Sequence, residues 1–152
     1  MERAKHIVLA FPDEGVSVTA ILLGDLAPRT CDAVWQHLPL SGFAHHGIYS
    51  GSEVYVHWPS PFEVEPENQT SAVLPGDVGY YYQPGGRHYG FPDDFCEVCW
   101  FYDRAAVPSM PGGPVRVNLF ASMIGNPESF FAVCHRMRIE GRKPFLVSAA
   151  EE

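Results

Sequence analysis

Residues 45–58, HHGIYSGSEVYVHW, gather imidazole, carboxyl and phenol groups in one short stretch. Glu53, Tyr55 and His57 are spaced two residues apart, and in a β-strand such side chains point to the same face, about 7 Å from one another. A carboxylate beside a histidine can orient the imidazole and raise its basicity, which suits a general base. The spacing predicts acid–base chemistry if a groove covers this face, and a solvated polar face if none does.

His46 is the fourth candidate catalytic residue. Apolar and polar residues alternate on both sides of Ser50-Gly51-Ser52, which predicts a hairpin with those three residues as its turn. The alternation puts His46 on one face together with Ile48 and Ser50, and His46 and Glu53 need not share a face. The core face of the second strand is predicted to carry Val54, Val56 and Trp58.

A metal site is the alternative use of these histidines. Three or four ligand atoms would have to converge within about 2.0–2.3 Å of one zinc ion. Adjacent histidines in a strand point to opposite faces, and no tight motif such as HExxH is present. We therefore expect neither a metal nor another cofactor, although the sequence leaves open whether the histidines converge. The ligands considered are His45, His46, Glu53, His57 and His88.

A second group of candidate residues lies mostly within YYYQPGGRHYGFP, residues 80–92. Turns at the mouth of a barrel often carry ligands. Arg87 could clamp a carboxylate, and Asn118 could form a polar wall. The alternative is a packed, tyrosine-rich strand followed by a loop. The candidate ligand-binding residues are Tyr80, Tyr82, Arg87, His88 and Asn118.

The four cysteines do not form an evident metal or redox motif. Cys96 and Cys99 have CxxC spacing, but they lie in FCEVCWFY, a strand pattern in which an odd separation places the two sulfurs on opposite faces. Cys31 and Cys134 fall on predicted helix faces and are expected to be small core residues. We expect four free thiols.

The elements that must position these side chains are mostly short strands between Gly- and Pro-rich turns. Two helices are expected: one from Pro28 to about Leu38, and one that begins at Pro127, is capped by Asn126 and stops at Gly141. The pattern predicts a mainly β chain, a single domain over residues 1–152 that forms a closed antiparallel barrel of about eight strands with two capping helices. The expected strands lie in residues 6–11, 16–23, 45–58, 77–82, 93–103, 115–124 and 143–149.

Charge and hydropathy limit the partners. The net charge is −8 and no basic run occurs, so a phosphate backbone would be repelled and we expect no nucleic acid. No stretch approaches the roughly 20 apolar residues that span a bilayer, and the N-terminus has no signal-peptide core. We expect a cytoplasmic protein without a membrane partner.

Two segments, LAPRTCDAVWQHL and YSGSEVYVH, resemble the cyclophilins. In that family a strand leads into Ala-Pro-x-Thr at a helix start, and a Tyr-x-Gly-Ser turn leads into a strand that carries Phe-His-Arg. Here the triplet falls on Val54, Tyr55 and Val56, so Val56 replaces the arginine that cyclophilins place against the substrate prolyl bond. The resemblance implies a cyclophilin-like barrel and, as an alternative function, peptidyl-prolyl isomerisation without electrostatic help from that arginine.

The chain is also similar to small, uncharacterised bacterial proteins that share this cyclophilin-like barrel. HHGIYSGSEVY follows their His-x-x-aromatic-Ser-Gly-x-Glu-Val pattern from His46 onward, and PGDVGYYYQPGG follows their Gly-Asp-x-x-Tyr and Pro-Gly. VNLFASMI resembles their Asn-His-Phe-Ala strand, with Leu119 in place of the histidine. The likeness spans roughly residues 18–147, and it implies the fold without implying a reaction.

Together these features predict a small-molecule ligand in a pocket on the barrel. The protein would be a binding protein, or an isomerase, lyase or hydrolase that uses metal-independent acid–base chemistry on a small polar substrate. A further alternative is a non-catalytic interaction module that forms a homodimer or higher homo-oligomer through exposed aromatic side chains. The sequence does not identify the ligand.

Overall fold

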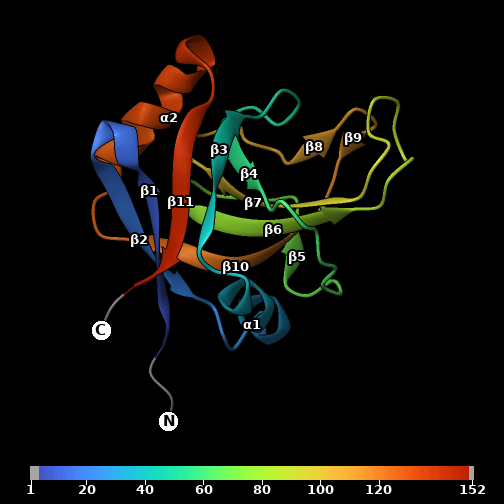
Figure 1. Cartoon of the computed structure of the whole chain (residues 1–152), viewed down its shortest axis with the longest axis horizontal. Helices are drawn as coiled ribbons and strands as arrows, with labels where there is room; N and C mark the ends of the chain where they lie inside the picture. The colour runs from blue at the N-terminus through green and yellow to red at the C-terminus, as the bar shows by residue number, and fades with distance from the viewer. Residues whose placement is uncertain (1–3, 151–152) are drawn as a thin grey trace.

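The computed structural model describes residues 4–150, and its main feature is a closed antiparallel barrel (Figure 1). Because the last barrel strand pairs with the first, no barrel strand is left with an open edge. This confirms the predicted mainly β closed barrel of about eight strands. Around the barrel the strands are β2 (Val16–Leu22), β1 (His6–Phe11), β11 (Lys143–Ala149), β3 (Leu40–His46), β4 (Glu53–His57), β7 (Phe95–Phe101), β6 (Asp77–Gln83) and β10 (Val117–Ile124).

Two helices accompany the barrel, α1 (Pro28–Gln36) and α2 (Glu128–Glu140), which confirms their number and place. Helix α1 ends two residues before the predicted Leu38. At the start of α2 the Asn126 side chain accepts a hydrogen bond from the backbone N–H of Glu128 at 3.0 Å, and the helix ends at Gly141, whose φ of 82° suits glycine. The remaining short elements are η1 (Pro12–Glu14), β5 (Gln69–Thr70), β8 (Ser109–Met110) and β9 (Gly113–Pro114).

Alternation along the strands separates an inner from an outer face. Val54, Val56 and Trp58 are buried inside the barrel, as predicted. Trp100 of β7 also points inward, where its ring stacks on Phe145 at 4.5 Å between centroids. The predicted apolar face of α2 is buried in the same core and consists of Phe130, Val133, Cys134 and Met137.

The outer face of β4, β7 and β6 is not bare. It carries a second, smaller apolar cluster that includes Tyr81, Cys99 and Phe101. Residues from the segment after β7, among them Ala106 and Met110, pack onto this cluster, and the β8–β9 hairpin lies outside the barrel (Figure 1). The polar row of β4, which consists of Glu53, Tyr55 and His57, faces a groove rather than open solvent only if this outer face is covered.

The connection between β3 and β4 differs from the predicted three-residue turn. Strand β3 ends at His46, paired with Val54, and residues 47–52 form a longer loop. The strand alternation therefore does not extend to Ile48 and Ser50. Gly51 is required in this loop, because its φ is 76° and a Cβ there would lie 2.8 Å from the backbone oxygen of Ala105.

The cysteines lie as the strand parity predicts. Cys96 belongs to the barrel interior and Cys99 to the outer cluster, and all four cysteines are free and buried. Within residues 4–150, no helix combines the length and hydropathy needed to cross a membrane.

Candidate functional site

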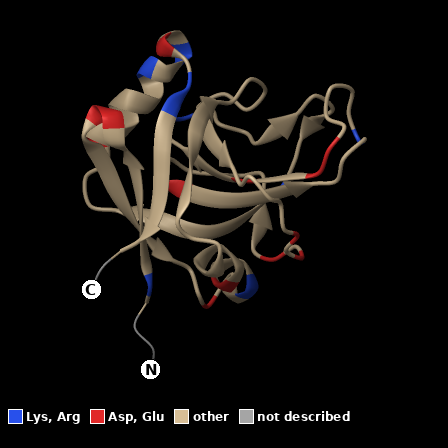
Figure 2. Ribbon diagram, viewed as in Figure 1, with Lys and Arg blue, Asp and Glu red and all other residues tan. Residues whose placement is uncertain are grey.

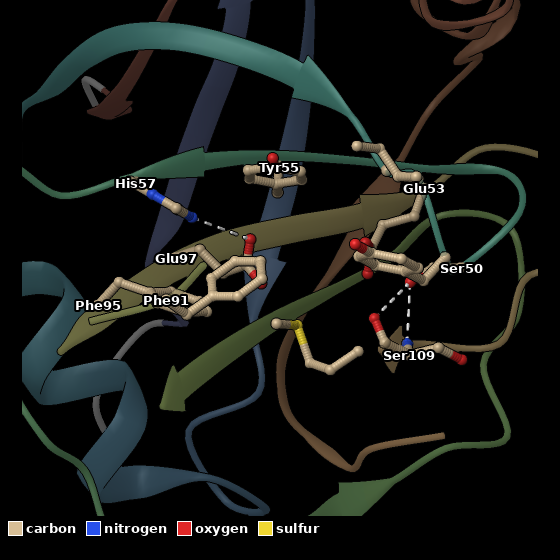
Figure 3. Close-up of a pocket in the computed structure, with 12 residues that line it drawn as sticks. Ser50, Glu53, Tyr55, His57, Phe91, Phe95, Glu97 and Ser109 are labelled. Atoms are coloured by element: carbon tan, nitrogen blue, oxygen red, sulfur yellow. Dashed lines mark hydrogen bonds and ion pairs between the residues drawn. The ribbon is translucent and has the colours of Figure 1, made fainter. Parts of the chain in front are cut away.

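A pocket opens on the outer face of the barrel, over β4 and β7, with a cavity volume of about 90 Å³ (Figure 3). Its floor is the sheet, and its opposite walls come from the β3–β4 loop, the loop before β7 and the strand β8. Strand β4 contributes Glu53, Tyr55 and His57, and β7 contributes Phe95 and Glu97. The walls add residues 47–50 together with Phe91, Ser109 and Met110.

Three of the four predicted catalytic residues meet in this pocket. Glu53, Tyr55 and His57 share the outer face of β4, as their two-residue spacing implies. Glu53 is almost fully buried, Tyr55 is half-buried and His57 is partly exposed. The sequence predicted acid–base chemistry only if a groove covers this face, and that groove is present. The catalytic role of these residues stays a prediction.

Glu97 completes the site and was not among the predicted residues. It lies directly opposite His57 in the β4–β7 ladder and is 7% exposed. Its Oε2 is buried and has no hydrogen-bond partner among residues 4–150, and the Nε2 of His57 is 3.7 Å away, which is longer than a hydrogen bond. The sequence does contain a signal for Glu97, because it is the single acid inside FCEVCWF. An ionisable residue in a buried strand is rarely structural alone.

The environment favours the neutral form of both glutamates. Burial raises the pKa of Glu97 well above its ordinary value, and the charge of Glu53 raises it further. Burial raises the pKa of Glu53 to about 7, partly opposed by the Ser50 hydroxyl and the Cys99 thiol. Near neutral pH the Glu97 carboxyl therefore holds a proton while Glu53 is close to its midpoint.

His57 and Tyr55, the other two residues of the polar row of β4, are neutral near pH 7. Burial lowers the pKa of His57, and the nearby His45 lowers it further. Burial raises the pKa of Tyr55 to about 12. The imidazole of His57 stacks on Phe95 with ring centroids 4.8 Å apart, which fixes its plane at the side of the pocket. A neutral imidazole in that position can accept a proton or a hydrogen bond.

His46, the fourth predicted catalytic residue, does not line this pocket. Its Nε2 lies 2.6 Å from the hydroxyl oxygen of Tyr102, which also accepts a hydrogen bond from Nε of Arg138 at 2.9 Å. Arg138 donates a second hydrogen bond to the Ser52 hydroxyl at 3.0 Å. The structure thus places His46 in a network that ties α2 to the β3–β4 loop, apart from the side chain of Glu53.

The predicted ligand-binding residues lie elsewhere on the barrel. The Tyr80 ring is inside the core, and its hydroxyl donates to the backbone oxygen of Phe62. The amide of Asn118 donates to Thr30 and to the backbone of Glu65, both at 3.1 Å. A separate surface hollow is lined in part by Tyr80, Tyr82, Arg87 and Asn118.

His88 does not line that hollow and bridges to Phe91 in the loop before β7. Among the residues that the structure describes, no three His, Cys, Asp or Glu side chains are arranged to hold a metal ion. The histidines considered as joint ligands, His45, His46, His57 and His88, are therefore not arranged around one metal position, although His45 lies near His57.

Comparison with known proteins places the chain in a family. Residues 9–149 match the family described as "Protein of unknown function (DUF3830)", and the chain belongs to that family. This agrees with the predicted membership of an uncharacterised family. No curated protein matches the chain.

Two solved structures share the fold. The solution structure of the hypothetical protein AF2241 from Archaeoglobus fulgidus is 21% identical, with a TM-score of 0.61, and the match covers 98% of each chain. The structure of McbB in complex with tryptophan is 13% identical, with a TM-score of 0.66, over 96% of this chain and 45% of McbB. At these identities the likeness shows the fold alone.

Proposed function

We propose that the protein binds a small organic molecule in the outer-face pocket, with Glu53 and Glu97 at the polar end of the site. The observation that carries this is the buried Oε2 of Glu97, which has no partner. Leaving a buried polar group unsatisfied costs about 1–3 kcal/mol, and a ligand that donates to this oxygen would remove that cost.

The walls of the pocket suit an apolar body. Tyr55, Phe91 and Phe95 present rings, and Met110 adds an adaptable side chain. A cavity of about 90 Å³ is smaller than the roughly 150 Å³ cavity that encloses a benzene ring. One group of the ligand would therefore enter the pocket, and the rest would lie at the mouth against the exposed Ile48 and Tyr49.

The protonation states also support acid–base chemistry, as expected of an isomerase, lyase or hydrolase. Glu97 would supply a proton, and Glu53, whose pKa is about 7, would accept one near neutral pH. His57 would orient a substrate group beside Glu97, at 3.7 Å from its Oε2. The McbB structure contains tryptophan, so tryptophan is a reasonable first compound to test.

The test is a fragment screen by thermal shift that includes tryptophan, with hits located by NMR on the labelled protein. We expect hits that raise Tm and that perturb resonances of Phe95 and Tyr55. Glu97→Gln and Phe95→Ala should abolish these shifts in Tm while preserving the circular dichroism spectrum of the folded protein.

The matched control is Glu128→Gln, which removes an exposed carboxylate on α2 and should leave every hit unchanged. A screen without hits, or hits that both pocket variants bind as well as the wild type does, would overturn the proposal.

A further inference from the structure

Building on the proposed pocket, we infer that its ligand is a monocation: a protonated amine or another basic nitrogen attached to a flat, apolar body. The side chains that line the pocket include two carboxyl groups and neither lysine nor arginine. The basic residues that the structure describes lie elsewhere, in α1, in α2, at the start of β11 and in loops outside the lining (Figure 2). An anionic ligand would find no positive charge in the pocket to offset its desolvation.

The hydrogen-bonding capacity of the pocket points in the same direction. The Ser50 hydroxyl has two acceptors within reach, the backbone oxygen of Ser109 at 3.3 Å and the Glu53 carboxyl, and the Ser109 hydroxyl donates to the backbone oxygen of Val107 at 2.8 Å. Both serine protons are therefore already used. The principal unfilled group is Oε2 of Glu97, which is an acceptor in the ionised carboxylate, and an ammonium group brings only donors.

The aromatic walls favour the same ligand. Tyr55, Phe91 and Phe95 surround the approach to Glu97 (Figure 3). A cation within about 6 Å of an aromatic face gains about 0.5–2 kcal/mol, because the negative face of the ring attracts positive charge. Rings around a carboxyl group are a common way to hold a basic nitrogen with an apolar body.

Binding of a cation must be coupled to release of a proton. Without ligand, burial keeps Glu97 protonated, and a cation stabilises the ionised form, so the carboxyl proton leaves to the solvent. The affinity for a cation should therefore rise with pH, by up to about tenfold per pH unit below the raised pKa values.

Other titratable groups that face the two glutamates do not reverse the expected rise of cation affinity with pH. Burial raises the pKa values of Tyr55, Tyr81 and Cys99 and lowers those of His45 and His57, so these five groups are neutral near pH 7. Arg87 acts on Tyr81 but does not line the cavity.

The experiment uses three probes with one ring: benzylammonium, benzyl alcohol and benzoate. Their Kd values are measured by NMR titration and calorimetry between about pH 6 and about pH 8, where benzylammonium and benzoate both keep their charge almost entirely. We expect benzylammonium to bind at least about tenfold more tightly than the alcohol at the upper pH, and benzoate not to bind.

Calorimetry in two buffers of different ionisation enthalpy should show net proton release on binding of benzylammonium. Glu97→Gln should remove the proton release and leave benzylammonium binding no more tightly than benzyl alcohol. Glu128→Gln should match the wild type in every measurement.

Equal or tighter binding of benzyl alcohol or benzoate in the pocket overturns the cation inference and leaves the proposed function standing. If none of the three probes perturbs the pocket, the cation inference fails too. The fragment screen then decides the proposed function separately: neutral hits in the pocket support it, and their absence overturns it.

Discussion

His57 and Glu97 face each other across the β4–β7 ladder, with Nε2 and Oε2 3.7 Å apart and no hydrogen bond between them. The pair is not an ion pair, because burial lowers the pKa of His57 and raises that of Glu97, so both are neutral near pH 7. Two neutral groups at this distance leave a position between them that one donor of a ligand can occupy.

The first prediction concerns stability and pH in Glu97→Gln. A folded pKa above the ordinary value of 4.5 means that the folded protein holds the proton more tightly than the unfolded chain does. The stabilisation from the neutral carboxyl is fully present below about pH 4.5 and is lost as pH rises toward the folded pKa. Glutamine has no proton to lose. The free energy of unfolding of the variant, relative to that of the wild type, should therefore rise by up to about 1.4 kcal/mol per pH unit.

Urea unfolding between about pH 5 and about pH 8.5 measures this difference. For Glu53→Gln the gain should level off above pH 7, because the folded pKa of Glu53 is about 7. A flat difference for Glu97→Gln would mean that its carboxyl is ionised in the folded protein.

The second prediction separates His46 from the pocket. Tyr102→Phe removes a buried hydroxyl that meets both His46 and Arg138, so Nε2 of His46 and Nε of Arg138 each lose this partner, while Arg138 keeps its hydrogen bond to Ser52. The free energy of unfolding should fall by about 1–3 kcal/mol. The affinity for pocket ligands should stay within about twofold of the wild type, because none of the three side chains lines the pocket.

His46→Gln should behave in the same way, with reduced stability and unchanged ligand affinity. A loss of ligand affinity in either variant, with the fold intact by circular dichroism, would place the His46 network in the functional site after all.

The third prediction uses a glycine at the edge of the pocket. A Cβ on Gly47 would lie 3.0 Å from Oε1 of Glu53 and 3.3 Å from its backbone oxygen. Gly47→Ala should displace the Glu53 carboxyl and weaken ligand binding by at least about threefold, a change of about 0.7 kcal/mol. Gly24→Ala is the matched control, because a Cβ there meets nothing within 4 Å. Equal affinity in the two variants would contradict the crowding of Glu53.

The barrel and the polar row of β4 could be predicted from the sequence because both depend on local periodicity. Alternation placed Val54, Val56 and Trp58 inside, and the same parity placed Glu53 and His57 outside. Parity cannot show which strand becomes the neighbour of β4. The pairing with β7 joins residues about 40 positions apart in sequence, and this pairing brings Glu97 opposite His57.

The residues that were placed differently show the limits of the same reasoning. His46 is the last residue of β3 and pairs with Val54, whose side chain points into the barrel, so it lies away from the outer-face pocket. The strand alternation does not continue through the loop that follows. Tyr80 and Asn118 line a separate hollow, and their polar atoms also hydrogen-bond to the backbone of residues 62 and 65 and to Thr30; their ligand-binding role stays a prediction. Such long-range partners have no signature in a single sequence.

The last prediction tests whether the CxxC spacing has chemical meaning. Cys96 and Cys99 point to opposite faces of β7, so they cannot form a disulfide without rearrangement of the strand. Burial raises the pKa of Cys96 to about 11 and that of Cys99 well above its usual range, and the reactive thiolate is therefore scarce. Cys31 and Cys134 are likewise buried, with pKa values raised to about 11 and about 12.

We therefore expect Ellman's reagent to modify none of the four thiols quickly in the native protein, and all four in denaturant. Native labelling should follow the rate of unfolding, so a destabilising variant such as Tyr102→Phe should label faster. Mass spectrometry after mild oxidation should show reduced Cys96 and Cys99. Fast labelling of these two residues in the folded protein, or a disulfide between them, would show that β7 opens under native conditions and that the floor of the pocket is not rigid.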